Sequence, residues 1–478
     1  MLRYFLLLWC SSLVLTPLAL AQAPDGRSLS GPDAHDSPLG LNGHLTGNWG
    51  GARSTLKEHG VDFDFEYISD SLWNVKSDKK ERLASWNSGR GTVDIDLASL
   101  IHAPGLYFHA TALWQGGGNL GTYLGTESSP SGMSSYNLFR LDSWWFEKQW
   151  KRDRVAMRIG QFAGQDFYGD QHYGTSFIFE PMGYALSNLS TTFETGSPGS
   201  TPALELTVAP IHNVYVASIV LAGDRIAFFH NPTGLVPQFR GAPISVSEIG
   251  FTPGKKTLAM RPADDVSTRK GYSGMYKFGA SFNPGKFTTS TNTIRSGNYL
   301  LYWMASQALW RVDPREGKGL DVTAAYDWSP ANVNSDNREL TAGLRFNEPL
   351  PLRIHNTLAV GYVRNKLNPL FLPRGAAPYQ AEQGIEANML FNVRPMILLQ
   401  PTFQYYANVG GGAQRAVVAG FRARIEFQTL LRMKSSHWVS TRCLSMFPNP
   451  IAPRSFTCRH QHRKKFQKRW HNSLQLSS

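Results

Sequence analysis

The stretch "VDFDFEY", residues 61–67, alternates without exception between apolar and acidic residues. Its odd positions are Val61, Phe63, Phe65 and Tyr67, and its even positions are Asp62, Asp64 and Glu66. Successive side chains of a β-strand point to opposite faces of the sheet. The stretch therefore predicts a strand with one apolar face and one acidic face.

The same period of two recurs along most of the chain. "TVDIDL" (92–97) and "RAVVAGFRARIEF" (415–427) show it most clearly. With these segments the pattern predicts about sixteen strands, of which 243–252 is the least regular. The other candidates are 105–115, 140–149, 153–161, 203–211, 213–222, 274–283, 299–312, 319–330, 338–348, 352–364, 382–393 and 396–407.

The connections between these segments alternate in length. Short ones fall at 103–105, 151–153, 212–213, 313–319, 348–351 and 394–395, and long ones at 116–139, 162–202, 223–242, 284–298 and 365–381. Short turns on one rim and long loops on the other are typical of a bacterial outer-membrane barrel. Residues 253–273 break the rule, because they are long where a short turn is expected. Either that connection is unusual or the segment 243–252 is not a strand.

Alternation alone does not distinguish a membrane barrel from a soluble β-sandwich, whose strands also have one polar face. Three features favour the membrane: an export leader, a body without cysteine, and aromatic residues near strand ends. These aromatic residues are Tyr67, Trp73, Trp114, Trp145, Trp150, Tyr326, Trp328, Tyr362 and Tyr405. We predict an all-β, transmembrane antiparallel β-barrel of about 16 strands over 61–427, which is wide enough for a water-filled lumen.

Both ends of the chain differ from this body. Residues 1–21 have an early cation, an apolar run and small residues at Ala19 and Ala21, which predicts a cleaved signal peptide. No later run of about 18 apolar residues predicts a membrane-spanning helix. Residues 22–44 are rich in Pro, Gly, Ser and Asp and predict a flexible arm, and 45–60 predict a short periplasmic helix segment that Gly60 ends.

The net charge of +13 is concentrated in a basic tail at 428–478, which has ten Lys and Arg and no Asp or Glu. Residues 22–427 carry 37 Lys and Arg against 35 Asp and Glu, so we expect no nucleic-acid partner for the body. The cysteines are Cys10, Cys443 and Cys458, which excludes a disulfide scaffold for the body. We interpret the tail as the product of a shifted reading frame or of a fused segment. The alternative is an arm that binds nucleic acid or lipopolysaccharide.

Three segments of the sequence resemble a known family. "LTGNWGGARSTLKEHGVDFDFEY" (45–67) is similar to the N-terminal signature of the carbohydrate-selective outer-membrane porins of the OprB type, with Asn48 where an acidic residue is more usual. "RIGQFAGQDFYGD" (158–170) and "LQPTFQYYANVGGG" (399–412) resemble the family's strand into its long third loop and its closing hairpin. The resemblance covers about 45–427. It implies a sixteen-stranded porin for sugar diffusion, narrowed by loops folded into the channel.

Strand parity gives candidate pore-lining residues. If Phe427 faces lipid, charged residues on the opposite parity face the lumen, where they offer hydrogen bonds to a sugar or form an arginine–carboxylate ladder in the wall. These candidates are Arg158, Asp321, Asp327, Arg345, Arg353, Glu386, Arg422, Arg424 and Glu426. The aromatic-rich stretch 162–202 predicts an infolded constriction loop with Asp166 and Tyr168 as sugar contacts, although its rings can equally pin the loop to the wall. Trp49 and Arg53 are candidates for the periplasmic mouth.

The predicted function is passive, carbohydrate-selective diffusion of monosaccharides or small oligosaccharides. A general or anion-preferring porin and a surface sugar-binding adhesin are the alternatives. No HExxH, Gly-x-Ser-x-Gly or phosphate-loop motif occurs in the body, so we expect neither an enzyme nor a metal or cofactor. An outer-membrane lipase barrel is the specific enzymatic alternative. Expected partners are outer-membrane lipid, lipopolysaccharide and the barrel assembly machinery, and either a monomer or a trimer fits.

Overall fold

The computed structural model describes residues 49–133, 136–150, 154–169, 176–183, 198–211, 213–224, 226–253, 272, 274–312, 317–371, 378–394 and 396–427. The chain divides into two units, Met1–Leu430 and Leu431–Ser478. All the described strands and helices belong to the first unit. The expectations for the leader 1–21, the arm 22–44 and the tail 428–478 lie outside the described residues.

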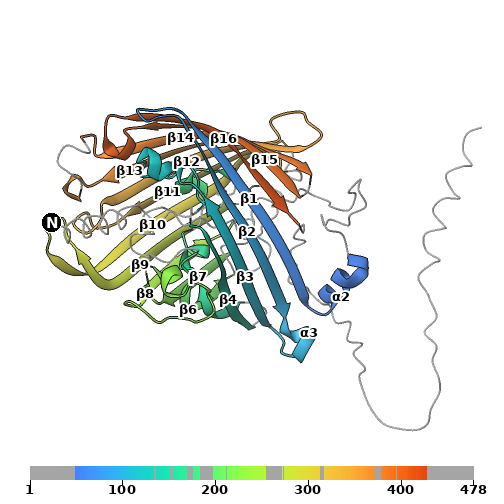
Figure 1. The fold of residues 1–478 in the computed structure, drawn as a ribbon. Coiled ribbons are helices and arrows are strands. Elements are labelled where there is room, and N and C mark those ends of the chain that lie inside the picture. The colour runs from blue at the N-terminus through green and yellow to red at the C-terminus, as the bar shows by residue number, and fades with distance from the viewer. Residues whose placement is uncertain are drawn as a thin grey trace, which may run out of the picture. The chain divides into compact units, whose positions relative to one another are not determined.

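Sixteen strands form the body of the chain (Figure 1). They are β1 (Val61–Lys76), β2 (Arg82–Asp96), β3 (Leu106–Gly117), β4 (Leu138–Trp150), β5 (Val155–Phe162), β6 (Thr201–Ile211), β7 (Val214–Leu221), β8 (Ile244–Phe251), β9 (Gly274–Thr288), β10 (Ile294–Arg311), β11 (Gly319–Trp328), β12 (Asp336–Asn347), β13 (His355–Leu367), β14 (Ala381–Arg394), β15 (Ile397–Ala407) and β16 (Arg415–Glu426).

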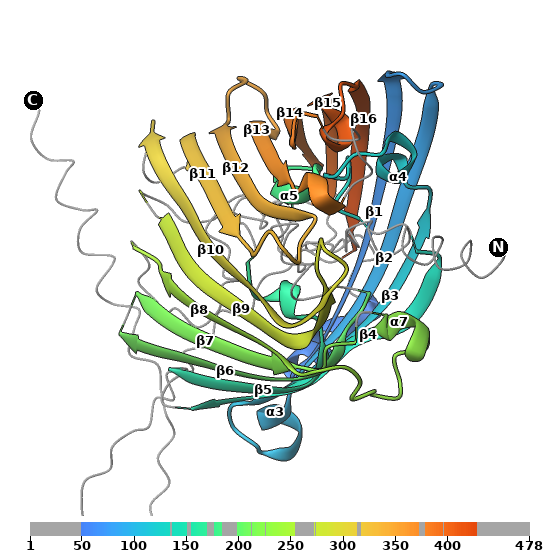
Figure 2. The same cartoon turned by 90° about the vertical axis from the view of Figure 1, so that its left-hand side faces the viewer.

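Each strand pairs antiparallel with its neighbours in sequence, and β1 also pairs with β16, so the sheet is a closed barrel. The seam between the first and last strands runs from Glu66 opposite Glu426 to Lys76 opposite Val417 (Figure 2). Closure leaves no strand edge without a hydrogen-bonding partner, which a sheet in hydrocarbon requires. The predicted transmembrane fold of about 16 antiparallel strands is confirmed.

The helices are short and lie in the connections. They are η2 (Trp49–Gly51), α2 (Ala52–Glu58), α3 (Leu97–Ile101), α4 (Leu120–Leu124), η3 (Gly164–Asp166), α5 (Glu180–Gly183), α7 (Ala227–His230), η5 (Pro369–Phe371) and η6 (Val409–Gly411). The predicted helix before the first strand is α2, and Gly60 follows it with a positive φ of 83°. Within the described ranges, no helix has the length and hydrophobicity that crossing a membrane requires.

The opening heptapeptide has the two faces that its sequence predicts. In β1, Phe65 and Trp73 point outward with 42% and 45% of their surfaces exposed, whereas Glu66 on the inner face is 3% exposed. The outer face continues around the barrel as a band of exposed large apolar residues, such as Phe278 and Phe403. In a membrane this band contacts lipid, and the acidic face borders the lumen.

Two predicted boundaries differ from the structure. The stretch 284–298 is not a long loop, because β9 extends to Thr288, β10 begins at Ile294, and Thr289 donates from its backbone to Thr293 to close a tight turn, at 2.8 Å. Leu97 starts α3 instead of ending a strand, since the Asp96 side chain accepts a hydrogen bond from the Ala98 backbone and caps that helix. The irregular segment 243–252 is a strand, β8, so the connection after it is the unusual feature.

Trp145 also differs from its expected place near the lipid interface. The register of β4 against β3 shifts between the Thr111–Ser143 and Ala112–Leu141 pairs, so Asp142 is an extra residue in β4. A β-bulge of this kind reverses the parity of the residues that follow it. Trp145 consequently points into the barrel, where it is 7% exposed and stacks on His109 at a ring distance of 3.8 Å.

Candidate functional site

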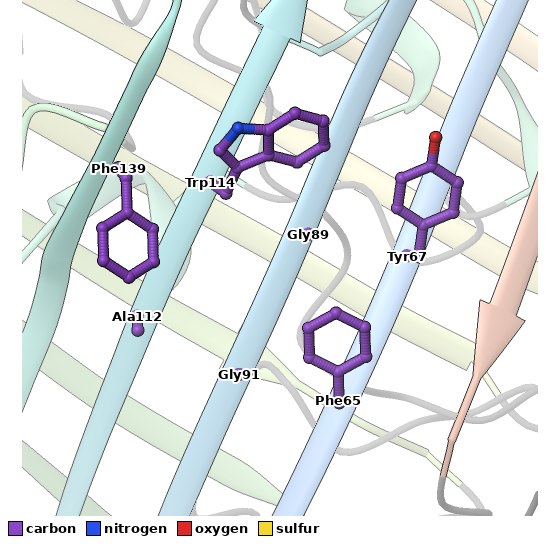
Figure 3. Close-up of a pocket in the computed structure, with 7 residues that line it drawn as sticks. All are labelled: Phe65, Tyr67, Gly89, Gly91, Ala112, Trp114 and Phe139. Atoms are coloured by element: carbon purple, nitrogen blue, oxygen red, sulfur yellow. The ribbon is translucent and has the colours of Figure 1, made fainter.

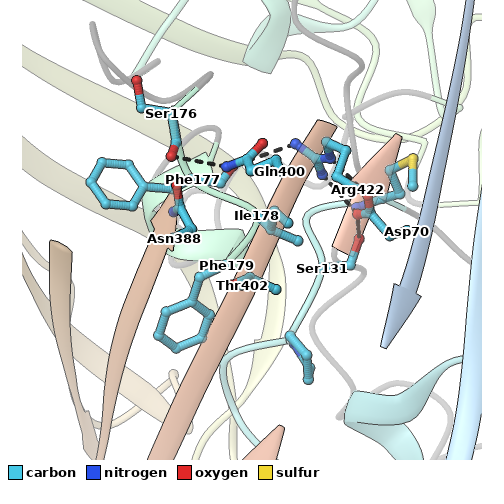
Figure 4. Close-up of polar contacts among 12 residues, drawn as sticks. Asp70, Ser131, Ser176, Phe177, Ile178, Phe179, Asn388, Gln400, Thr402 and Arg422 are labelled. Carbon is cyan, nitrogen blue, oxygen red and sulfur yellow. Dashed lines mark hydrogen bonds and ion pairs between the residues drawn. The ribbon is translucent and has the colours of Figure 1, made fainter. Parts of the chain in front are cut away.

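The described part of the 163–200 loop, which connects β5 to β6, lies inside the barrel (Figure 4). Glu386 on the inner face of β14 accepts hydrogen bonds from the backbone N–H groups of Ile178 and Phe179, at 3.0 and 2.9 Å. Gln400 on β15 donates to the Ser176 carbonyl at 3.1 Å. The loop is thus attached through its main chain to the wall opposite its own strands.

The 118–137 loop, between β3 and β4, lies beside it. Gly132 donates from its backbone to the Ile178 carbonyl at 2.9 Å, and Glu180 donates from its backbone to the Ser129 carbonyl at 3.1 Å. The Glu180 carboxylate in turn accepts from the Ser129 N–H at 2.9 Å. These reciprocal bonds couple the two loops. Both loops therefore lie on the path from the long-loop rim into the lumen.

Carboxylates of the wall anchor the loops at three more points. Glu382 on β14 accepts from the N–H groups of Glu127 and Ser128, both at 2.9 Å. Asp70 on β1 accepts from the Ser131 hydroxyl at 2.7 Å. On the opposite side of the barrel, Glu248 of β8 accepts from the Gly169 N–H at 3.3 Å. Hydrogen bonds to ionised acceptors are the stronger kind, so a few such contacts can hold a loop.

The aromatic residues of the 163–200 loop pack against the wall and leave no ring exposed among those described. Phe177 and Phe179 are 1% and 0% exposed, and Gly361 and Gly384 on the wall provide their space, because a Cβ there would lie 2.9 and 2.4 Å from these rings. Tyr168 is 0% exposed. The expected sugar contact of Tyr168 is therefore not supported, since a buried ring offers no face to a sugar.

Asp166 ends the 3-10 turn Gly164–Asp166, and its side chain lies outside the described residues. Its predicted sugar contact stays a prediction. Phe167, next in the chain, packs edge-on against Phe162 with ring centroids 5.6 Å apart. The start of the loop is thus attached to its own strand.

Arg158 is bound on both sides by carboxylates of neighbouring strands. It pairs with Glu147 at 3.0 Å and with Glu205, and its guanidinium lies 4.0 Å from the Phe167 ring centroid. Glu147 and Glu205 are its direct neighbours in the β4 and β6 ladders. Its place in the structure corresponds to the arginine–carboxylate ladder, one of the two roles expected for these charges.

The other predicted lining charges form similar groups. Asp321 pairs with Arg311 and lies 3.7 Å from Arg345. Asp327 accepts from the Glu339 N–H at 3.0 Å. Arg422 is bidentate to Asp70 at 2.7 and 2.8 Å, and Arg424 pairs with Glu66 and with Glu426, the latter at 2.8 Å. These residues face the lumen as parity predicts, but they are buried in the wall.

Arg353 is an exception to the parity argument. It lies before β13 begins at His355, in the turn that follows β12, and it is exposed. A residue in a turn has no strand parity, so the expectation that it lines the lumen is wrong. The order Leu352, Arg353, Ile354 alternates apolar and polar residues like a strand, but it lies in a turn.

Trp49 and Arg53 contact each other beside the first strand. The Arg53 guanidinium lies 4.4 Å from the Trp49 ring centroid, Arg53 is 7% exposed, and Trp49 is 49% exposed. An arginine over an indole face is a favourable cation–π contact. Their role at the periplasmic mouth stays a prediction.

The accessible part of the inner wall lies elsewhere, on β1 to β3. We call Asp64, Arg90, Thr92, Asp94 and His109 the lumen patch; all face inward and keep exposed surface. An Asp94 carboxylate oxygen lies 2.7 Å from His109 Nδ1, and 54% of the Asp94 side chain is exposed. Two nitrogens of Arg90, Nε and Nη2, are buried and have no hydrogen-bond partner among the described residues. Sequence reasoning missed Arg90 and His109, although the parity of "TVDIDL" extends to Arg90.

Within the described residues, no three His, Cys, Asp or Glu side chains converge as ligands of a metal would. The inner wall instead alternates donors and acceptors around a lumen that two loops enter. Such a site can bind and pass polar solutes.

The model of the family described as "Carbohydrate-selective porin, OprB family" matches residues 80–427. The chain belongs to this OprB family. The matched residues run from the turn before β2 to the residue after β16, so they include fifteen complete strands. The 45–67 segment that resembles the family's N-terminal signature lies wholly before them. Family and fold indicate a porin, a class of channel proteins, in a bacterial outer membrane.

Solved structures of the porin OprB from Pseudomonas putida have the same fold. The high-pH structure is 16% identical, with a TM-score of 0.72, and the alignment covers 80% of this chain and 98% of that chain. The low-pH structure is also 16% identical and has the same coverage, with a TM-score of 0.52. No curated protein sequence matches this OprB-family chain.

Proposed function

We propose that this OprB-family protein lets monosaccharides or small oligosaccharides diffuse passively through its lumen, without a cofactor or a chemical step. The observation that carries the proposal is the pair of coupled loops inside a closed barrel of this family. They narrow a lumen that would otherwise be a wide aqueous pore. Narrowing lets groups on the wall contact a solute as it passes.

The lumen patch supplies the chemistry that a neutral sugar needs. A sugar that loses hydration must find donors and acceptors in return, and selectivity follows from the lining groups and the bore. Asp94 offers a half-exposed carboxylate, and Arg90 keeps part of its side chain exposed, with its Nε and Nη2 atoms buried. Because these groups stand on the same inward face, several hydroxyls of one sugar can bind at once.

Single-channel recording in planar bilayers tests the proposal, with glucose and maltose added as blockers. We expect flickering block by sugar, and for Arg90→Ala a block weakened about 5-fold, which corresponds to one hydrogen bond of about 1 kcal/mol. Arg364→Ala is the matched control, because Arg364 is an exposed arginine on the outward parity of β13. Its block should equal that of the unchanged protein.

Two results would reject the proposal. Ion flux that sugars do not affect would identify a general or anion-preferring porin. The absence of conductance from correctly folded protein would favour a surface sugar-binding adhesin. Equal block of the Arg90→Ala and unchanged channels would leave sugar diffusion in place but remove Arg90 from it.

A further inference from the structure

A recess interrupts the outer face of the barrel across β1 to β4 (Figure 3). It has a volume of about 390 Å³. It is lined by Phe65, Tyr67, Gly89, Gly91, Ala112, Trp114 and Phe139. We call it the outer groove. It is separate from the lumen and from the two infolded loops.

The strand register explains the shape of the outer groove. Gly89 of β2 lies between Tyr67 of β1 and Trp114 of β3, and Gly91 lies between Phe65 and Ala112 in the next outward row. The small residues form the floor, and aromatic rings on the flanking strands form the walls, as Figure 3 shows. The rings of Tyr67 and Trp114 are nearly parallel, at 18°, with centroids 6.5 Å apart.

The floor of the outer groove is open where a larger residue would fit. A Cβ at Gly91 would meet only Phe65, at 3.8 Å, and one at Gly89 would come no closer than 3.4 Å, to Trp114. These are ordinary van der Waals distances, so backbone crowding does not require glycine at either position. The recess is therefore not a by-product of tight packing around the strand.

The lining is mainly carbon. The hydroxyl of Tyr67 is already engaged within the chain, because it donates to the Asn87 side chain at 2.8 Å. The groove thus presents aromatic and aliphatic carbon to whatever fills it. On the outer face of a membrane barrel, the surrounding medium is the hydrocarbon of lipid chains.

We propose that the outer groove binds one acyl chain of a phospholipid from the periplasmic leaflet. The groove continues the apolar band that contacts lipid. Its Phe65 end adjoins the end of β16, where Phe65 packs edge-on against Phe427 at a ring distance of 4.9 Å. At that level β16 ends and β15 begins, so this end of the groove belongs to the rim with short turns, which faces the periplasm in outer-membrane barrels. The Phe139 end lies near the start of β4, toward the rim with long loops.

A second copy of the chain is a poorer fit to the outer groove. A stable protein interface needs about 20 to 30 residues on each side, with a polar rim. The groove has seven lining residues, and its tyrosine hydroxyl is already bonded within the chain. A narrow apolar recess matches a flexible chain better than it matches a broad complementary surface.

Native mass spectrometry of the full chain, released from nanodiscs of phosphatidylethanolamine, tests the proposal. We expect one phospholipid to stay bound under activation that removes the rest. Ala112→Leu fills the groove and should lower the lipid-bound fraction about tenfold, because the chain loses its apolar contact area. Ala280→Leu is the matched control, since Ala280 is a partly exposed alanine on the outward face of β9 outside the groove.

A second variant guards against a folding defect in the first. Phe139→Ala removes a wall without adding bulk and should also reduce the retained lipid, while heat-modifiable gel migration reports that each barrel is folded. Equal retention in all four proteins overturns the proposal. So does retention of lipid A in place of phospholipid from mixed nanodiscs, and so does a stable oligomer that Ala112→Leu dissociates. None of these readouts depends on sugar conduction.

Discussion

Single carboxylates on the inner wall determine where the two loops lie. Glu386, Glu382 and Glu248 each accept hydrogen bonds from the backbone of an infolded loop. A backbone N–H that leaves water needs a partner, and a carboxylate has several lone pairs to offer. Alternation in the sequence suggests that such inward carboxylates contact a solute. These three instead hold the protein's own loops.

Removing the Glu386 carboxylate should release the 163–200 loop. In Glu386→Ala the N–H groups of Ile178 and Phe179 lose their acceptor, and hydrogen bonds to charged groups contribute about 1.5–3 kcal/mol each. We expect much faster amide hydrogen exchange at both residues, with an intermediate rate in Glu386→Gln. Glu348→Ala, in the turn after β12, is the control. Unchanged exchange at Ile178 in Glu386→Ala would show that the rings alone hold the loop.

The contact between the two loops should weaken as pH rises. Burial, with Glu127 and Glu382 nearby, raises the pKa of Glu180 to about 8, although the Ser129 N–H opposes this shift. Because the pKa of Glu180 is higher when the two loops are in contact, the protonated carboxyl favours the contact. This stabilisation is complete below pH 4.5, the ordinary pKa of a glutamate, and is lost as the pH rises to about 8. The Ser129 amide protection factor should fall over this range, and Glu180→Gln should make the fall smaller, with the remainder due to Glu127, whose pKa burial also raises to about 8. Protection that increases with pH would contradict the assignment.

At the scale of elements, the 163–200 loop sits on a row of glycines in neighbouring strands. Gly343 of β12 lies opposite Gly361 of β13, and Gly361 lies opposite Glu386 of β14. The glycines against which the loop packs are therefore next to the carboxylate that accepts its backbone hydrogen bonds. Glycine is needed because α5 and the rings before it approach the wall closely. Tyr215 and Tyr302 occupy comparable spaces above Gly250 and Gly279, where both donate to Glu248.

Adding one methyl group to a wall glycine tests how closely the loop packs against the wall. In Gly361→Ala the new Cβ would lie 2.2 Å from Met182 Sδ, so the loop must shift, at a cost of roughly 1–3 kcal/mol for overpacking. We expect faster proteolysis of the loop and a changed conductance with the barrel intact. Gly91→Ala adds the same methyl on the outer face, where the nearest atom is 3.8 Å away, and should change neither. Equal proteolysis and conductance in both variants would show that the loop does not pack tightly against Gly361.

At the scale of the whole molecule, ion pairs between the first and last strands reinforce the closure. Asp70 and Arg422 are direct neighbours across the seam, and Arg424 reaches Glu66 on β1. The residues in each pair are far apart in sequence, so only the closed barrel brings them together. The charged groups of these pairs are buried, so each one needs its oppositely charged partner to offset the loss of hydration.

Breaking one pair should destabilise the barrel strongly. Arg422→Ala leaves Asp70, which is 0% exposed, without its bidentate partner, and loss of one member of a buried pair costs about 3–5 kcal/mol. We expect a lower urea midpoint for unfolding in detergent micelles, measured by tryptophan fluorescence. The double variant Asp70→Asn/Arg422→Ala should recover part of the loss, and Arg364→Ala should cause none. Arg422 also donates to the Phe177 carbonyl. If the double variant recovers no stability, the loss of that hydrogen bond accounts for the effect of Arg422→Ala.

Most of the strands, their two faces and the infolded loop can be predicted from the sequence alone, although the pattern misplaces the β9–β10 turn and the end of β2. Alternation is a local property, so "VDFDFEY" specifies an apolar and an acidic face without reference to any other segment. The roles of single residues depend on tertiary contacts. A bulge turns Trp145 inward, Tyr168 is buried, Arg353 lies in a turn outside the lumen, and two buried nitrogens of Arg90 have no partner among the described residues. These outcomes depend on contacts between distant segments, and a pattern with a period of two contains no information about which partner each inward side chain meets.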